Sequence, residues 1–372
     1  MLTRELKLKL TKKQETQILE YFYILTGVYN SVIRSIELNP LDKNDNYKVF
    51  KNPFYFNNLY SNHAKRVGIH SQVLQQTVKQ ACNSWERYFK KLSKKPRLKG
   101  IKNKLHSFCY PQFDNKKLTF SKIKLPSIGE VRYHKQEIPL GKIKQVRILR
   151  KASGYYVQLT IDTTHKFKVN DTDKKVGIDT GFKHLAILSD GIKYENQRNF
   201  IKSQTRLAQS QRGRNKKLTS RIHERIANKR KDYNHKVSKE IVVNNKEIYV
   251  TKDNLRNQTK IFGKSVSDAG IAQLRSFIAY KSANSGRLFK LVDSKYTTMI
   301  CSECMGRSGP TGLSKLKVRA WECSVCRTVH DRDINSARVI LKLGAGTALE
   351  QSRKQLTENS FFKEESSSLR KR

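Results

Sequence analysis

Four cysteines in two pairs near the end of the sequence constrain its fold more than any other feature. Cys301 and Cys304 form one Cys-x-x-Cys pair, and Cys323 and Cys326 form a second pair after a gap of 18 residues. This spacing is typical of a ribbon in which four thiolates bind one Zn²⁺ ion. Because four thiolates complete the tetrahedral shell and leave no position for water, we expect the zinc to be structural.

The charge of the chain points to a polyanionic partner. Its 372 residues include 76 Lys and Arg against 31 Asp and Glu, a formal net charge of +45. Such a charge repels itself in one compact protein unless a polyanion neutralises it, and nucleic acid is the usual partner. The sequence has no apolar run of about 18 residues, the length of a membrane-spanning helix, and its first residues lack the apolar core of a signal peptide. We therefore expect a cytoplasmic nucleic-acid-binding protein with no membrane partner, in which Cys82 and Cys109 are ordinary buried thiols.

The first half of the sequence predicts a β domain with an inserted helical lobe. Residues 1–10 alternate as a strand does, and a capping-box pattern beginning at Thr11 starts a long helix. A second long helix begins at about Ser71, and we expect its Trp85 to pack in the core. From Lys94 onward, short alternating segments separated by Gly, Pro and Asn predict a β-barrel or meander, with a hairpin at 146–162.

The second half alternates strands with helices, which predicts an α/β arrangement of layers. Residues 174–196 predict a strand that ends at Asp179, followed by a hairpin with an Asp-Gly turn. A meander whose first strand carries a lone aspartate is the opening of an RNase H-like fold, and the alternative is that Asp179 caps a turn. Strands at 246–255 and 287–298 and a helix at 268–286 complete this pattern.

Residues 201–240 predict the most basic helix of the chain, with thirteen Lys or Arg. Apolar residues recur along one face of this helix, from Leu218 to Val237, so we expect that face to pack on a sheet. The other face is expected to contact nucleic-acid phosphates, although a solvated charged surface is the alternative. The residues expected to bind nucleic acid are Arg212, Arg214, Lys216, Lys217, Arg221, Arg225, Lys229, Arg230 and Lys231.

Two aspartates, Asp331 and Asp333, stand directly after the second cysteine pair and directly before a predicted helix. They bind a catalytic metal whose other ligands lie elsewhere in the chain, or Asp333 caps the helix. Both roles are compatible, since one carboxylate oxygen can cap while the other binds metal.

The order of these features resembles the TnpB family of transposon-encoded RNA-guided nucleases, which is related to compact type V CRISPR effectors. The stretches most similar to the family are "KSVSDAG" (264–270), "YTTMICSEC" (296–304) and "TVHDRDINSARVIL" (328–341), and the resemblance extends from residue 1 to about residue 345. It implies a bacterial, nucleoid-associated protein whose partners are a guide RNA and double-stranded target DNA.

The resemblance also implies a multidomain α+β architecture. The expected parts are a wedge-like β-barrel at 1–10 and 94–170, a helical recognition lobe at 11–93, an RNase H-like (RuvC) domain at 171–297 and 328–345, a zinc ribbon at 298–327 and a disordered tail at 346–372.

In such proteins the RuvC domain cuts DNA with two divalent ions, because paired ions stabilise both the attacking and the leaving oxygen. Mg²⁺ prefers oxygen ligands, so the domain uses a triad of carboxylates. By resemblance, Asp179 is the first member of the triad and Asp333 the third, with Asp331 close by.

The second member of the triad in the family is a glutamate, and this sequence has none at either expected position. Alignment of one position gives Asp253, with Lys252 beside it, and the other position is Ser294. An aspartate is one methylene shorter than glutamate, and a lysine ammonium competes with the metal.

We therefore expect RNA-guided, sequence-specific binding of double-stranded DNA with a degraded RuvC site, and repression of transcription by occupancy. The alternative is an active RNA-guided endonuclease that uses Asp179, Asp253 and Asp333 with Mg²⁺. A third possibility is a transposon zinc-ribbon protein that binds DNA without a guide.

Overall fold

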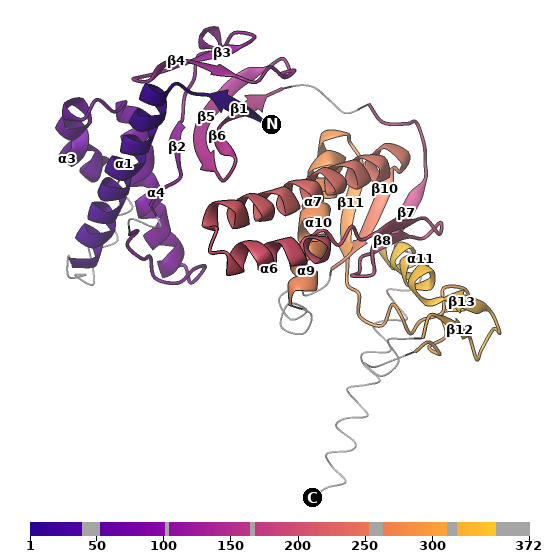
Figure 1. The fold of residues 1–372 in the computed structure, drawn as a ribbon. Helices are drawn as coiled ribbons and strands as arrows, with labels where there is room; N and C mark the ends of the chain where they lie inside the picture. The colour runs from indigo at the N-terminus through magenta and orange to yellow at the C-terminus, as the bar shows by residue number, and fades with distance from the viewer. Residues whose placement is uncertain (39–52, 101–103, 164–167, 253–262, 311–317, 347–372) are drawn as a thin grey trace, which may run out of the picture. The chain divides into compact units, whose positions relative to one another are not determined.

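The computed structural model describes residues 1–38, 53–100, 104–163, 168–252, 263–310 and 318–346 (Figure 1). Asp253 and the tail from residue 347 onward lie outside the described residues. The chain forms two compact units, Met1–His165 and Lys166–Arg372.

The N-terminal unit contains a six-stranded sheet in the order β2-β5-β6-β1-β4-β3 (Figure 1). Its strands are β1 (Leu2–Lys9), β2 (Ser107–Tyr110), β3 (Lys122–Leu125), β4 (Gly129–Tyr133), β5 (Lys142–Lys151) and β6 (Gly154–Asp162). The predicted hairpin is confirmed, because β5 and β6 pair antiparallel along their length. The predicted β-barrel is present only as a half-barrel: among the described residues, the outer strands β2 and β3 have no ladder with each other. Each of these outer strands is four residues long.

Three helices, α1 (Lys12–Leu38), α3 (Pro53–Arg66) and α4 (Ser71–Phe89), pack with this sheet around one hydrophobic core. The capping box that starts α1 is confirmed, since the Gln14 amide donates to Thr11 Oγ1 (3.3 Å) and the Thr11 amide donates to Gln14 Oε1 (3.1 Å). Trp85 is a core residue as expected, with 5% of its surface exposed. A short 3₁₀ helix, η2 (Asn115–Lys117), precedes β3.

The two isolated cysteines lie in the N-terminal unit. Cys82 and Cys109 are both buried and free. Burial raises the pKa of each thiol to about 11, so both remain protonated at neutral pH, as expected for structural residues.

The C-terminal unit is built on a mixed five-stranded sheet in the order β11-β10-β7-β8-β9. Its strands are β7 (Lys175–Asp179), β8 (His184–Leu188), β9 (Lys193–Glu195), β10 (Glu247–Thr251) and β11 (Leu288–Val292). Strands β7, β8 and β9 form the predicted antiparallel meander, whereas β10 and β11 are parallel to β7. The predicted Asp-Gly turn is confirmed: Gly191 has a φ of 95°, and its amide donates to Leu188 O (2.9 Å).

Helices cover both faces of this sheet. Helices α7 (Lys216–Asn244) and α10 (Ile271–Asn284) form a core with one face, and α11 (Arg332–Gly344) forms a smaller core with the other. The unit therefore has three layers, as the alternation of strands and helices predicted.

The single basic helix predicted at 201–240 is wrong, because the chain breaks there into α5 (Asn199–Lys202), α6 (Gln204–Arg212) and α7. Gly213 ends α6, and Arg214 takes a positive φ of 50°. Asn215 then caps α7 by accepting a hydrogen bond from the Leu218 amide (2.9 Å). Helices α6 and α7 share a small apolar cluster, and burial of that cluster stabilises the turn.

The helix predicted at 268–286 is also interrupted. Gly270, with a φ of 67°, separates α9 (Lys264–Ala269) from α10. A Cβ at this position would lie 2.8 Å from Arg230 Cδ of α7, so the glycine allows the α9–α10 corner to approach α7 closely. No helix in the described part of the chain is both long and apolar enough to cross a membrane.

Candidate catalytic site and cysteine cluster

Asp179, the last residue of β7, lies in a row of residues that crosses the sheet. Asp179 is paired with Ile187 of β8, which is paired with Lys193 of β9. On the other side, Val250 of β10 is paired with Ile178 of β7. Thr251 is the next residue of β10, so it lies beside Asp179 of β7. Residues paired across neighbouring strands point to the same face of a sheet. Lys193, Asp179 and Thr251 therefore belong to one face.

Helix α11 packs on this same face. A Cβ at Gly177 would lie 2.1 Å from the carbonyl oxygen of Ala337, so only glycine permits this approach of helix to strand. Asp179 comes two residues after Gly177 on the same strand face, and Asp333 comes one turn before Ala337 on the same helix face. The packing thus brings Asp179 and Asp333 to the same side of the sheet.

The helix cap belongs to Asp331 rather than to Asp333. Asp331 Oδ1 accepts hydrogen bonds from the amides of Asp333 (3.0 Å) and Ile334 (3.1 Å), and its Oδ2 accepts one from Lys193 Nζ (2.7 Å). Burial opposes ionisation, but these hydrogen bonds outweigh it and hold the pKa of Asp331 below its ordinary value. The prediction that Asp333 caps the helix is wrong because the helix begins two residues earlier than supposed, at Arg332.

Asp333 forms an ion pair instead. Its Oδ2 lies 3.1 Å from Nη1 of Arg319, whose side chain is 51% exposed. An ion pair with a half-exposed guanidinium contributes about 1 kcal/mol or less, so a stronger ligand can displace Arg319. The Asp333 side chain itself is 23% exposed and is accessible to an ion from solvent.

Lys252, the neighbour of Asp253 in sequence, and Ser294 lie just beyond the ends of neighbouring strands. The Lys252 amide, just beyond β10, donates to Val292 O of β11 (2.7 Å), and Ser294 comes two residues beyond β11. The sequence reasoning missed Asp293, an exposed carboxylate between Val292 and Ser294. The parallel register of β10 and β11 places Asp293 at the same edge of the sheet as Asp179.

A buried polar group lies behind this edge. Thr180 Oγ1 is 2.9 Å from Thr251 Oγ1, and Arg275 Nη2 of α10 donates to Thr180 Oγ1 (3.1 Å). The guanidinium therefore reaches the strand ends from the opposite face of the sheet. Sequence reasoning gave no signal for Arg275, because only the packing of α10 brings it beside Thr180.

The four cysteines form one cluster, as their spacing predicted. Their Sγ atoms all lie within 4.8 Å of one another, and the pairs Cys301–Cys326 and Cys304–Cys323 are each 3.6 Å apart. A tetrahedral zinc ion with Zn–S bonds of about 2.3 Å requires sulfur atoms about 3.8 Å apart, so the cluster fits Zn²⁺. Among the described residues, no other group of three or more Cys, His, Asp or Glu has ligand atoms close enough to hold a metal.

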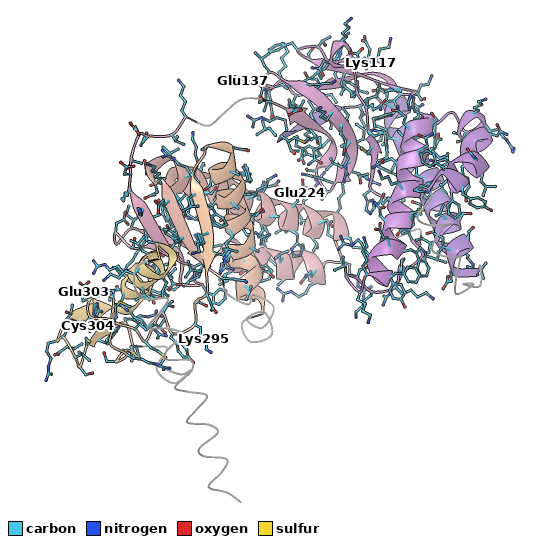
Figure 2. All side chains as sticks on the ribbon, turned by 180° about the vertical axis from the view of Figure 1, so that it is seen from behind. Lys117, Glu137, Glu224, Lys295, Glu303 and Cys304 are labelled. Atoms are coloured by element: carbon cyan, nitrogen blue, oxygen red, sulfur yellow. The ribbon has the colours of Figure 1, made fainter. Side chains whose placement is uncertain are left out.

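Backbone amides support these thiolates. The amides of Glu303 and Gly306 donate to the Sγ atoms of Cys301 and Cys304, each at 3.4 Å; Figure 2 shows Glu303 and Cys304 together in this segment. A backbone hydrogen bond from Cys326 lowers the pKa of Cys323 to about 6, helped by Ser308 Oγ (3.2 Å). The short strands β12 (Ala320–Glu322) and β13 (Val329–Asp331) pair antiparallel and flank the second cysteine pair.

Most of the basic residues expected to bind nucleic acid are exposed on α6, α7 and the turn between them. Arg230 is an exception, since it is half-buried and its Nη1 donates to Ser267 O. Their role in nucleic-acid binding remains a prediction.

The chain thus has a three-layered unit with an aspartate-bearing sheet edge, a four-cysteine cluster and a strongly basic surface. Residues 158–261 match the family described as "Probable transposase" (OrfB of IS605), and residues 272–340 match the "Cas12f1-like, TNB domain" family.

Comparison with individual proteins gives the family. A Streptomyces pristinaespiralis protein named "Putative RNA-guided DNA endonuclease" is 30% identical over 296 residues, covering 74% of this chain and 72% of the relative. "Putative RNA-guided DNA endonuclease InsQ" of Escherichia coli (strain K12) is 29% identical over 303 residues, covering 74% of each chain. The chain therefore belongs to the TnpB family, as its motifs indicated. A cryo-EM structure titled as a Cas12f1-sgRNA-target DNA complex aligns over 92% of this chain and 99% of that chain, with 14% identity and a TM-score of 0.36, too low to add to this assignment.

Proposed function

We propose that this protein is an RNA-guided DNA endonuclease whose RuvC-like site uses Asp179 and Asp333, with Asp331 as the cap that orients the helix. The proposal is carried by the placement of Asp179, at the end of β7, on the sheet face against which α11 packs. The names of relatives about 30% identical over most of the chain support it.

The topology of the C-terminal unit supports the RNase H-like assignment. An antiparallel meander of three strands is followed by two strands parallel to the first, which gives the order β11-β10-β7-β8-β9. The first strand is then central, and residues at its carboxyl end lie beside the ends of β10 and β11. This is the arrangement expected of a domain that gathers carboxylates from segments distant in sequence.

The proposal replaces the expectation of a degraded site. That expectation depended on the absence of a glutamate, with Asp253 beside Lys252 at one aligned position and Ser294 at the other, and nothing among the described residues shows that the site has lost its function. Two aspartates are candidates for the third carboxylate: Asp253, by alignment, and Asp293, by the register of β11.

The chemistry expected at this site follows from its residues. Mg²⁺ held by these carboxylates would stabilise negative charge on the phosphate undergoing hydrolysis. Lys193 holds Asp331, and the Asp331 cap fixes the first turn of α11, so Asp333 is oriented by the backbone. Arg319 forms an ion pair with Asp333 that a metal ion would have to displace.

The nucleic acids have separate roles in the proposal. The guide RNA contacts the basic surface of α6 and α7, and base pairing between guide and target selects the DNA sequence. The four cysteines hold a structural zinc ion. The exposed positions Lys217 and Arg225 are examples of residues placed to contact phosphates.

The test begins with the RNA that co-purifies with the protein. Sequencing this RNA identifies the guide segment, and the purified complex is then incubated with matched and scrambled DNA in Mg²⁺. The proposal predicts cleavage of matched DNA alone. Retention of matched DNA without cleavage would favour RNA-guided DNA binding without nuclease activity. The ion pairs of Asp331 with Lys193 and of Asp333 with Arg319 are compatible with that function. Absence of a defined RNA would contradict both.

A further inference from the structure

Helix α11 holds the backbone on both sides of Cys301. Asn335, which is 1% exposed, accepts a hydrogen bond from the Ser302 amide at Oδ1 (2.8 Å) and donates one from Nδ2 to Ile300 O (2.7 Å). One buried side chain thus satisfies two backbone groups that flank the cysteine. Any shift of Cys301 relative to α11 leaves both groups and the asparagine unpaired, which is costly in a buried place.

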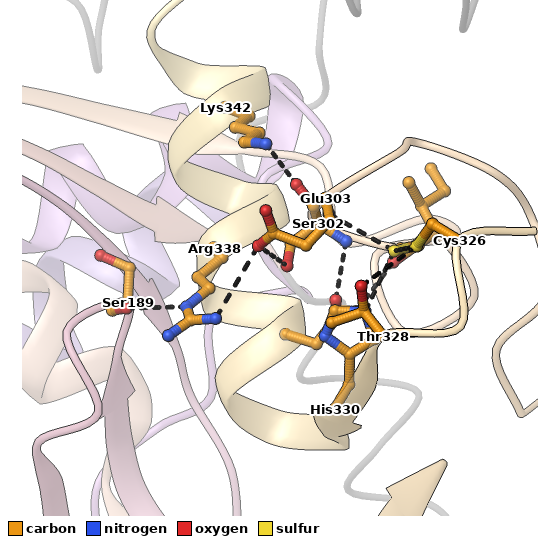
Figure 3. A network of polar contacts seen from close by, with 11 residues as sticks. Ser189, Ser302, Glu303, Cys326, Thr328, His330, Arg338 and Lys342 are labelled. Atoms are coloured by element: carbon orange, nitrogen blue, oxygen red, sulfur yellow. Dashed lines mark hydrogen bonds and ion pairs between the residues drawn. The ribbon is translucent and has the colours of Figure 1, made fainter. Parts of the chain in front are cut away.

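Further contacts extend this attachment along the helix (Figure 3). Lys342 Nζ donates to Ser302 O, and Ser336 Oγ lies 3.1 Å from Thr297 Oγ1. Arg338 Nη1 lies 3.9 Å from Glu303 Oε1, and its Nε donates to Ser189 O after β8 (3.4 Å). The first cysteine pair therefore packs against two successive turns of α11.

His330 makes a second connection to the cysteine cluster. It is 3% exposed, its Nε2 lies 3.0 Å from Cys301 Sγ, and its ring lies 4.9 Å from that of Trp321. His330 belongs to β13, and the next residue is Asp331, the helix cap. The residue that contacts the sulfur atom, His330, is thus adjacent in sequence to Asp331, the residue that caps α11.

The cysteine segment, residues 301–326, also supplies Arg319, the cationic side chain that pairs with Asp333. The Arg332 amide donates to Arg319 O (2.7 Å), just before β12, and the Arg319 side chain pairs with Asp333. The first turn of α11 therefore contacts the cysteine segment through its cap, its backbone and its carboxylate.

We propose that metal binding at the four cysteines fixes the position of the first turn of α11, and that Asn335 and His330 are the positioning residues that transmit this effect to Asp331 and Asp333. The importance of this coupling for cleavage rests on the proposed function, but the coupling itself does not. Without a metal, the paired thiols have no strong bond to hold Cys301 near Cys326. The partners of Asn335 then lose their fixed positions, and the cap at Asp331 is free to open.

Hydrogen–deuterium exchange of the full-length protein tests the coupling without any mutation. We compare zinc-loaded protein with protein stripped of metal by a chelator under reducing conditions. Stripping should speed exchange of the Asp333 and Ile334 amides about tenfold, the effect of losing one well-formed hydrogen bond. Helix α10, in the same unit, should not change. Loosening of residues 296–306 with unchanged exchange at Asp333 and Ile334 would overturn the proposal.

Variants test the two positioning residues. Asn335→Ala should keep one zinc per chain, raise exchange at Asp333 and Ile334 in the zinc-loaded state, and release zinc to a chromogenic chelator about tenfold faster. Asn196→Ala is the matched control. Asn196 also makes two side-chain bonds to backbone, with Phe182 O (2.9 Å) and the Arg198 amide (3.1 Å). Equal behaviour of the two variants would contradict a positioning role for Asn335.

For His330, the pair His330→Phe and His330→Gln separates packing from hydrogen bonding. Phenylalanine keeps a ring against Trp321 but has no donor for the sulfur, whereas glutamine retains an N–H donor. We expect zinc release to be faster in His330→Phe than in wild type, and to return to the wild-type rate in His330→Gln. Equal release rates in the two variants would refute the positioning role of His330. These readouts need no cleavage, so a failure of the coupling is distinguishable from a failure of the nuclease proposal.

Discussion

The contact between Gly177 and α11 allows a quantitative test of the site. In Gly177→Ala, the new Cβ would lie 2.1 Å from Ala337 O and 2.6 Å from Leu341 N, both backbone atoms that no rotamer change can move. Restoring an ordinary contact of about 3.4 Å to Ala337 O requires a shift of about 1.3 Å between β7 and α11. Overpacking of this kind costs about 1–3 kcal/mol, and we expect the upper end because the obstacle is backbone.

The same shift moves the end of β7, which carries Asp179, away from the first turn of α11, which carries Asp333. A displacement of about 1 Å at a catalytic site can lower the rate about a hundredfold, so Gly177→Ala should cleave DNA about a hundredfold more slowly while retaining its RNA.

Urea denaturation followed by circular dichroism measures the loss of stability, with hydrogen exchange to assign the transition to the C-terminal unit. Single-turnover cleavage of matched DNA measures the effect on the site. Gly27→Ala is the control, because a Cβ at Gly27 in α1 meets nothing within 4 Å, and a helical Gly-to-Ala change should stabilise by roughly 0.5–1 kcal/mol. Wild-type stability and cleavage in Gly177→Ala would refute the packing argument.

Three further predictions concern separate parts of the chain. First, one of Asp253→Ala and Asp293→Ala should lower single-turnover cleavage by roughly a thousandfold or more, which identifies the third carboxylate, and wild-type rates in both would rule out both candidates. Second, burial lowers the pKa of Lys281 to about 8 from its ordinary 10.5, while its Nζ donates to His235 O (2.6 Å) and Ser238 Oγ (2.7 Å). The unfolded chain therefore binds more protons between these two pH values, so the free energy of unfolding should rise with pH across this window by at most about 3 kcal/mol. Lys281→Met should remove this rise in urea denaturation series, and an identical pH dependence in both proteins would contradict it. Third, Lys217→Ala with Arg225→Ala should weaken binding of the co-purified RNA and reduce its salt dependence by about one unit of slope per lost phosphate contact, measured by filter binding. An unchanged slope would mean that these residues do not contact phosphate.

Local sequence patterns predicted the parts of the site that depend on local geometry. Cysteine spacing predicted the cluster of Cys301, Cys304, Cys323 and Cys326, because the ligand spacing of a ribbon is set by two short turns. The alternation and turn residues at 174–196 predicted the meander that ends its first strand at Asp179. Both features are determined by residues that lie close together in the sequence.

The remaining features depend on contacts between distant residues. Asp293 was missed because the register of parallel strands is not encoded near the residue, and Asn335 was missed because its partners lie 33 and 35 positions away. The break at Gly213 was missed because an isolated glycine is tolerated in a helical pattern, and only the packing of α6 on α7 decides its conformation. The cap shifted from Asp333 to Asp331 because β13 ends where the helix starts.

Cleavage of guide-matched DNA by wild-type protein and by Asp179→Ala, each with its co-purified RNA and Mg²⁺, tests the central claim most directly. Asp190→Ala, which removes an exposed aspartate of the β8–β9 turn paired with Lys174, is the matched control. We predict that wild-type and Asp190→Ala complexes cut the DNA, and that Asp179→Ala binds it without cutting. Intact DNA with the wild-type complex, or cleavage by Asp179→Ala at the wild-type rate, would contradict the account.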